Sequence, residues 1–426
     1  MPSPASPAPV RRHRTARRLG VAAVAIGLLA GACAKTDPQV SAGGPSSSGG
    51  ASSTEGGASS GGEVASGAPA VDVIPGMPPV PNPSNLYSEI GPSNLSPATA
   101  GAKRLVYVPN ERSGNVTVID QDSMKVIDTY PTGFIPQHVV PSYDLTTLYA
   151  LNNNGNSITP IDPTTGKPGK TFAVDDPYNL YWTPDGKSSI IVAEAKQRLD
   201  FADPKTLKVQ QELQTDCDGI NHIDFSIDGR YLAATCEFDG SIIKVDVVNR
   251  KVLGKLTLKK DDVLSQPQDI RVSPDGKTLY VADLKSEGVF TVDFESFAQT
   301  GHIKTGVGAH GLYPSRDGTK LYVINRGTPL VGGPPKGQGS VSVVDFATNQ
   351  MTANWPVPGG GSPDMGNLSA DGTKLWLGGR YDDEVYVFDT VKGELITRIK
   401  VGKGPHGLTV WPQPGRYSLG HTGNMR

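Results

Sequence analysis

Residues Gln268–Asp283 read QDIRVSPDGKTLYVAD, and the fold prediction rests on this segment. Alternating apolar residues precede an Asp275-Gly276 turn, and a β-prone run follows it, which predicts two short antiparallel strands. Partial copies of the unit begin at His138, Asn179, His222, His310, Asp364 and His406. The chain therefore repeats one supersecondary unit.

A third strand in each copy is expected to end at an aspartate that follows an apolar residue. These aspartates are Asp120, Asp162, Asp203, Asp246, Asp293, Asp345 and Asp389, spaced 42, 41, 43, 47, 52 and 44 residues apart, and the copy at Asp203 is degenerate. A fourth strand follows each, as in KVIDTYPTG from Lys125. Four short strands in every repeat of this length are typical of a propeller blade, and seven copies predict an all-β, closed seven-bladed propeller.

The two ends of the repeat region complement each other. Residues Lys103–Gly133 supply three strands of a first blade but no innermost strand, whereas Gly407–Trp411 supplies an innermost strand without a blade. Pairing them would close the ring and remove its open sheet edges. We therefore expect residues 103–426 to form the propeller.

The strand and turn motifs resemble a known family. The segments LYVAD, LYVIN and RLVYVPN, the SPDG turns and the VID endings are similar to the YVTN β-propeller repeats over about Lys103–Leu419. That family is related to the haem domain of cytochrome cd-type nitrite reductases and to quinoprotein-like propellers. The resemblance implies the architecture and not an activity, because these propellers host several unrelated functions.

Residues 1–32 are expected to be a lipoprotein signal peptide. Five arginines precede the apolar run Leu19–Ala32, which is too short to span a membrane. The run ends in LAGAC, which resembles a bacterial lipobox and predicts lipidation of Cys33. The expected location is the outer face of a bacterial plasma membrane, reached by export; an ordinary signal peptide with an incidental cysteine is the alternative.

Two further segments precede the propeller. Residues 33–70 are rich in Gly and Ser and predict a flexible tether, and residues 71–102 form a Pro-rich irregular arm. The 40 basic residues nearly balance the 42 acidic residues, so no electrostatic argument exists for nucleic acid as a partner. A monomer with a protein or small-molecule ligand is expected.

Candidate site residues occupy equivalent positions before the innermost strands, where they would ring one mouth of the channel. They are His138, Asn179, His222, Asp269, His310, Asp364 and His406; His302 and His421 are expected to lie elsewhere. Imidazole and carboxylate are ordinary ligands of zinc, copper and iron. Three interpretations stay open: side chains that hydrogen-bond the loops between blades, a haem or other organic ligand, and a transition-metal ion.

Charged residues are expected on the loops at the same mouth. They are Glu111, Arg112, Glu194, Glu237, Asp283, Arg326 and Arg380, and a solvated rim is the simplest interpretation. Arginines could also pair haem propionates, and carboxylates could act as bases. The Gly/Pro-rich insertion Gly327–Gly339 at this mouth is either a lid or a tolerated insertion.

The remaining two cysteines lie on either side of one turn. Reflection about that turn brings Cys217 within about two residues of Cys236, which favours a disulfide in an exported protein; a copper-binding pair beside His222 is the alternative. No nucleophile elbow, phosphate loop, CxxCH or CxxC is present. Two functions follow: a propeller that binds a ligand or partner protein, without enzymatic activity, or a metal- or haem-dependent oxidoreductase.

Overall fold

The computed structural model describes residues 69–426. The expected signal peptide, Cys33 and nearly all of the tether lie outside the described residues. No helix in the described part of the chain is long and apolar enough to cross a membrane.

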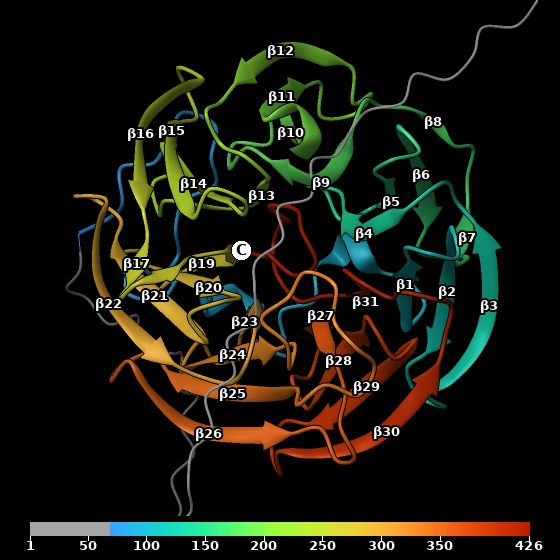
Figure 1. Ribbon diagram of the computed structural model, residues 1–426. Helices are drawn as coiled ribbons and strands as arrows, with labels where there is room; N and C mark the ends of the chain where they lie inside the picture. The colour runs from blue at the N-terminus through green and yellow to red at the C-terminus, as the bar shows by residue number, and fades with distance from the viewer. Residues whose placement is uncertain (1–68) are drawn as a thin grey trace, which may run out of the picture. The chain divides into compact units, whose positions relative to one another are not determined.

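Seven four-strand blades surround a central channel (Figure 1). The innermost strands are β4 (Pro136–Pro141), β9 (Pro177–Trp182), β13 (Ile220–Phe225), β19 (Pro267–Val272), β23 (Ala309–Pro314), β27 (Pro363–Leu368) and β31 (Thr409–Trp411). The second strands are β1 (Leu105–Asn110), β5 (Leu148–Asn152), β10 (Ser189–Ala193), β14 (Tyr231–Cys236), β20 (Thr278–Asp283), β24 (Lys320–Asn325) and β28 (Lys374–Gly379). The predicted seven-bladed, all-β propeller is confirmed.

The third and fourth strands complete each blade outward. The third strands are β2 (Asn115–Asp120), β6 (Ser157–Asp162), β11 (Arg198–Ala202), β15 (Ser241–Asp246), β21 (Gly288–Asp293), β25 (Ser340–Asp345) and β29 (Glu384–Asp389). The fourth are β3 (Lys125–Pro131), β12 (Val209–Gln214), β16 (Lys251–Thr257), β22 (Ala298–Lys304), β26 (Gln350–Pro356) and β30 (Glu394–Lys400), while β7 (Lys167–Pro168) and β8 (Phe172–Ala173) share that place beside β6. A small hairpin, β17 (Lys259–Lys260) with β18 (Val263–Leu264), lies outside the blades.

The Asp-Gly turns explain why the repeat folds as it does. In the turn between β19 and β20, the Ser273 hydroxyl donates to Asp275 Oδ1 at 2.5 Å, and Ser273 Oγ accepts from the Thr278 N–H at 2.9 Å. Gly276 adopts φ +76°, which a residue without a side chain tolerates best. Side-chain hydrogen bonds of this kind specify a tight turn locally, so each copy of the motif begins a hairpin without help from distant residues.

The ring closes between the two ends of the repeat region. Strand β31 pairs antiparallel with β1, with Trp411 opposite Leu105 and Thr409 opposite Tyr107. The blade therefore combines an innermost strand from the end of the repeats with three strands from their beginning. This is the predicted closure, and it leaves no open edge between the first and last blades.

The segment before β1 lies against the face of the ring that carries the Asp-Gly turns. It contains two 3-10 turns, η1 (Ser88–Ile90) and η2 (Pro97–Thr99). Tyr87 is buried, and its hydroxyl donates to the Val272 carbonyl at 2.7 Å. The Leu86 N–H donates to the Pro274 carbonyl at 2.7 Å. The segment thus packs where an innermost strand meets its turn.

Residues 412–426, here called the channel segment, follow β31 into the centre of the ring (Figure 1). Gly420 forms a bridge with Tyr181 of β9, and the His421 N–H donates to the Leu180 carbonyl at 3.0 Å. On the other side of the segment, Arg426 donates to Asp224 of β13 at 2.8 Å. The channel segment therefore runs between innermost strands of different blades.

Candidate metal centre

Five imidazole rings meet in the channel. The ring centroids lie 4.7 Å apart for His222 and His421, 4.9 Å for His138 and His406, and 5.8 Å for His310 and His406. Each of the five residues is at most 2% exposed. The structure thus brings together all four histidines that the repeat register aligns.

Their positions differ slightly from the expectation. His138 and His222 are the third residues of β4 and β13, and His310 is the second residue of β23, so these three lie inside innermost strands and not just before them. His406 does precede β31. The rings consequently lie within the channel, buried, and not around an open mouth.

The fifth histidine corrects the sequence analysis. His421 was expected to lie elsewhere because no copy of the repeat contains it. The channel segment instead brings its ring within 5.5 Å of His138 and 4.7 Å of His222, measured between centroids. The signals that pointed to it were a polar, glycine-containing stretch after the last repeat and the small number of histidines in the sequence, 7 in all. The other unaligned histidine, His302, does lie elsewhere, on the outer strand β22.

Three of the five histidines could share one ion. His138, His222 and His421 each offer a ring nitrogen, and these nitrogens all lie within 4.8 Å of one another. Imidazole nitrogens at such separations can move onto a common first-row metal ion with small side-chain rotations. This triad is the candidate metal centre.

Hydrogen bonding fixes the orientation of His138. Its Nδ1 lies 2.9 Å from the Tyr178 carbonyl oxygen, which can only accept, so Nδ1 carries the hydrogen. The lone pair is therefore on Nε2, which is buried and has no hydrogen-bond partner. Histidine ligands of metals are commonly held in this way, with the other ring nitrogen donating to a carbonyl.

His222 provides the clearest fit to an ion. Both of its ring nitrogens are buried without a hydrogen-bond partner. Burial holds the pKa of His222 well below 6.5, and the neighbouring His421 lowers it further, so the ring is neutral. An unpaired buried polar nitrogen costs free energy, and a metal ion would satisfy it.

His421 is held between two of the aligned residues. The Asn179 amide donates from Nδ2 to His421 Nδ1 at 3.0 Å, because Asn179 Oδ1 already accepts from the Leu180 N–H at 2.9 Å. The hydrogen of neutral His421 is then on Nε2, 3.6 Å from Asp269 Oδ2. Binding an ion through Nδ1 would require Asn179 to release that nitrogen.

Asp364 organises the other two histidines and makes a buried ionic cluster. It lies 2.6 Å from His406 Nδ1 and 3.3 Å from His310 Nδ1, and it pairs with Arg326 Nη2 at 2.6 Å. Arg380 approaches the same carboxylate at 3.3 Å. Although burial opposes ionisation, the guanidinium of Arg326 holds the pKa of Asp364 well below its usual value. Asp364 is therefore an anion that anchors this side of the channel.

The expected solvated rim is wrong for several of its residues. Asp283, Arg326 and Glu237 are buried at 0%, 1% and 7% exposure. Asp283 accepts backbone N–H groups of its own loop, at 2.7 Å from Ser286, and this is a structural role. These loops fold inward over the channel, so charges that look solvated in the sequence acquire protein partners.

The other four rim residues, Glu111, Arg112, Glu194 and Arg380, lie closer to the surface. Arg380 pairs with Glu111 at 2.8 Å as well as with Asp364. Burial raises the pKa of Glu194 to about 8, and the nearby carboxylate of Glu237 adds to the rise. Glu237 itself accepts from Asn221, the residue before His222, at 2.9 Å. Polar groups thus continue from the histidines toward this mouth.

The cysteine pair is a disulfide. Cys217 and Cys236 are bonded across the β13–β14 hairpin, as the reflection about the turn predicts. Their sulfur atoms are therefore not available as copper ligands, and the alternative of a copper-binding pair beside His222 is wrong.

The insertion Gly327–Gly339 lies against the next blade. The Tyr381 hydroxyl donates to the Val331 carbonyl, and the Lys336 N–H donates to Asp382 at 2.5 Å. Leu330 is 56% exposed. The insertion therefore has a defined docking place beside the loop that carries Arg380.

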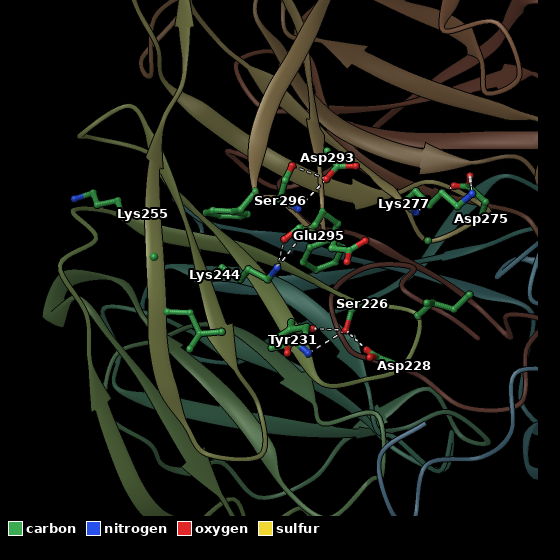
Figure 2. Close-up of a pocket in the computed structure, with 16 residues that line it drawn as sticks. Ser226, Asp228, Tyr231, Lys244, Lys255, Asp275, Lys277, Asp293, Glu295 and Ser296 are labelled. Carbon is green, nitrogen blue, oxygen red and sulfur yellow. Dashed lines mark hydrogen bonds and ion pairs between the residues drawn. The ribbon is translucent and has the colours of Figure 1, made fainter. Parts of the chain in front are cut away.

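A separate cavity of about 850 Å³ lies between the blades of β13–β16 and β19–β22. Figure 2 shows Lys244 reaching from β15 into it. The ammonium donates to the Phe294 and Glu295 carbonyls at 2.7 and 3.0 Å and lies 4.8 Å from the centroid of the Tyr231 ring. Because protein carbonyls already accept hydrogen bonds from the Lys244 ammonium group, we assign no reactive group to the cavity.

These features define the class of protein: a seven-bladed β-propeller with a histidine cluster in its channel. The sequence matches the family described as YNCE-like beta-propeller over residues 139–327 and 234–414. The matches together cover more than half of the chain, and the protein belongs to this family. No curated protein matches it.

Solved structures with the same fold come from several functional classes. The chain is similar to hydrazine synthase of Kuenenia stuttgartiensis, with 21% identity and a TM-score of 0.52, covering 63% of this chain and 87% of that one. A putative 6-phosphogluconolactonase from Bacteroides uniformis shares 19% identity with a TM-score of 0.57, covering 71% and 98%. The dihydro-heme d1 dehydrogenase NirN shares 14% identity with a TM-score of 0.53, covering 75% and 76%. At these identities the likeness establishes the fold alone.

Proposed function

We propose that this protein is an exported, lipid-anchored propeller that binds a first-row transition-metal ion in its channel through His138, His222 and His421. The observation that carries the proposal is His222, a buried neutral imidazole whose two nitrogens lack partners while two other imidazoles face it. Structural stabilisation alone would be better served by a hydrogen-bonded or apolar residue at this place.

The chemistry of the ligands limits which ion is expected. Imidazole suits Zn, Cu, Fe and Ni, whereas Mg and Ca prefer oxygen ligands. The neighbouring carboxylates of Asp269 and Asp364 are already engaged with the protein, and Asp269 accepts from the Leu312 N–H at 2.9 Å. The ion would be held by imidazole nitrogens. The two carboxylates would orient the histidines and balance the charge of the ion from farther away.

Haem fits the centre poorly. Neighbouring imidazole rings contact each other, with centroids 4.7 to 5.5 Å apart around His138 and His222. A planar macrocycle could enter between them only if the rings moved apart. Arg326 and Arg380, which might have paired propionates, are already paired with Asp364. We therefore favour a single ion over haem.

Metal analysis tests the proposal. The full chain, purified without a polyhistidine tag, would be titrated with Zn²⁺, Cu²⁺ and Co²⁺, with calorimetry and elemental analysis as the measurements. We expect one ion per chain, a d–d absorption band with Co²⁺, and loss of both in His138→Ala with His222→Ala.

A histidine outside the channel provides the control. His302 lies on β22 and bonds the Ser286 hydroxyl at 3.0 Å, so His302→Ala should bind metal as the unaltered protein does. A protein that takes up no ion, or a double variant with unchanged stoichiometry, would contradict the proposed function.

A further inference from the structure

We infer that the channel segment, residues 412–426, and the metal ion bind the ring in one linked equilibrium, so that the ion locks the segment into the channel and the segment completes the ion's site. This inference rests on the proposed function, because it assigns His421 as a ligand supplied from outside the blades. It goes further, because it predicts that the ion changes the conformational freedom of one segment of the chain.

The ligands differ in what holds them. His138 and His222 lie inside β4 and β13, which pair antiparallel with β5 and β14. The β13–β14 register is irregular at His222, whose N–H donates instead to the Thr235 hydroxyl at 3.0 Å. His421 belongs to no blade and has only the contacts of the channel segment. Two ligands are therefore fixed by the ring, and the third is present only while the segment is seated.

Few backbone hydrogen bonds hold the channel segment around Gly420 and His421, here called its tip. At the bridge between Gly420 and Tyr181, the His421 N–H donates to the Leu180 carbonyl at 3.0 Å and the Trp182 N–H donates to the Leu419 carbonyl at 3.1 Å. Elsewhere the Ser418 N–H donates to the Tyr143 carbonyl at 3.2 Å, and Asn424 and Arg426 donate to Asp224 at 3.0 and 2.8 Å. The buried side chains of Tyr417, Leu419 and Met425 pack into apolar clusters with blade residues. None of these contacts belongs to the strand pairing within a blade, so displacing the tip exposes buried surface and has a cost but leaves the blades intact.

Seating the segment without an ion carries a cost at the histidines. It covers the unpartnered nitrogens of His138 and His222 and places the His421 ring against them. Burying such nitrogens without partners is unfavourable. An ion that coordinates them removes this cost only in the seated state, and a ligand with such a preference shifts the equilibrium toward that state.

A substitution at Gly420 can displace the tip of the channel segment without altering any of the three proposed ligands. Gly420 has φ +97°, and a Cβ there would lie well inside van der Waals contact with the Leu180 carbonyl oxygen. Alanine is strained at such a φ and would collide with the backbone of β9. Gly420→Ala is therefore expected to move the tip, and with it His421, while leaving the ring histidines in place.

Hydrogen–deuterium exchange of the full chain tests the linkage. Peptides within 412–426 should exchange at least tenfold more slowly with saturating Zn²⁺ than with EDTA, while a peptide from β20 should not change. In His421→Ala the zinc-dependent protection should disappear, and the Kd for Zn²⁺ should rise at least tenfold. Gly420→Ala should raise the Kd in the same direction, and His302→Ala should change neither quantity.

The outcomes separate this inference from the proposed function. If the protein binds one Zn²⁺ but peptides of 412–426 exchange equally fast with and without it, the linkage is wrong and the metal site stands. The linkage is also wrong if His421→Ala binds Zn²⁺ with unchanged Kd. If the unaltered protein binds no metal, the proposed function itself fails. Because the exchange comparison uses the unaltered protein, it remains decisive even if a variant does not fold.

Discussion

Replacing Asp364 by asparagine should destabilise the propeller strongly, because it leaves a buried guanidinium without its counter-ion. Arg326 is 1% exposed, and Asp364 is its one carboxylate partner within residues 69–426, at 2.6 Å. Removing one partner of a buried ion pair typically costs about 3–5 kcal/mol. For a domain of this size the unfolding entropy is roughly 0.7 kcal/mol/K, so the thermal midpoint should fall by about 5 °C.

The assay is thermal and urea unfolding followed by circular dichroism. Because the pKa of Asp364 is held well below its usual value, its charge contributes fully above the ordinary carboxylate pKa and is lost only as pH falls through the lowered one. The difference should therefore appear at both pH 7 and pH 5.

An exposed ion pair provides the matched control for this variant. Asp122 is 70% exposed in its pair with Arg104, so Asp122→Asn should change the free energy of unfolding by less than about 1 kcal/mol. If Asp364→Asn behaves like Asp122→Asn, the account of Asp364 as a required anion is refuted.

Three other predictions address the covalent and titrating groups. Cys217→Ala with Cys236→Ala should lower the free energy of unfolding by about 3 kcal/mol by the chain-entropy argument, and a reductant should then affect only the unaltered protein; equal unfolding midpoints would contradict this. Cys33→Ala should release the protein from the bacterial membrane fraction, and unchanged fractionation would contradict the proposed lipid anchor. The five channel histidines have pKa values below 6.5, so the unfolded chain takes up protons first and stability should fall as pH drops below about 6.5. A flat urea-midpoint profile between pH 8 and 5.5 would argue against neutral buried rings.

The architecture was predictable because the repeat specifies itself locally. The Ser273–Asp275 turn bond and the hydrogen bond from Ser296 N–H to Asp293 at 2.8 Å each involve residues two or three positions apart. Such bonds form wherever the motif occurs, so the strands between them could be counted from the sequence. Ring closure followed from the strand count, since β31 and β1 were each incomplete without the other.

Burial of the charged loops could not be predicted in the same way. Arg326 and Arg112 follow the equivalent strands β24 and β1, yet only Arg326 is buried. The difference arises because Arg326 meets Asp364 of the next blade, whereas Arg112 pairs at the surface with Asp383. Which charge finds a buried partner depends on neighbouring blades, and local sequence does not contain that information.

His421 shows where repeat-based reasoning reaches its limit. The repeat register predicted the positions of the other four rings, because residues at equal offsets in equivalent strands point their side chains in the same direction. The position of His421 depends instead on the approach of Gly420 to Leu180 and on the Arg426–Asp224 ion pair, whose partners lie 202 residues apart. The family match ends at residue 414, before this histidine. A comparison of blades alone would therefore find two of the proposed ligands and miss the third, so the proposed metal site depends on the channel segment as much as on the propeller.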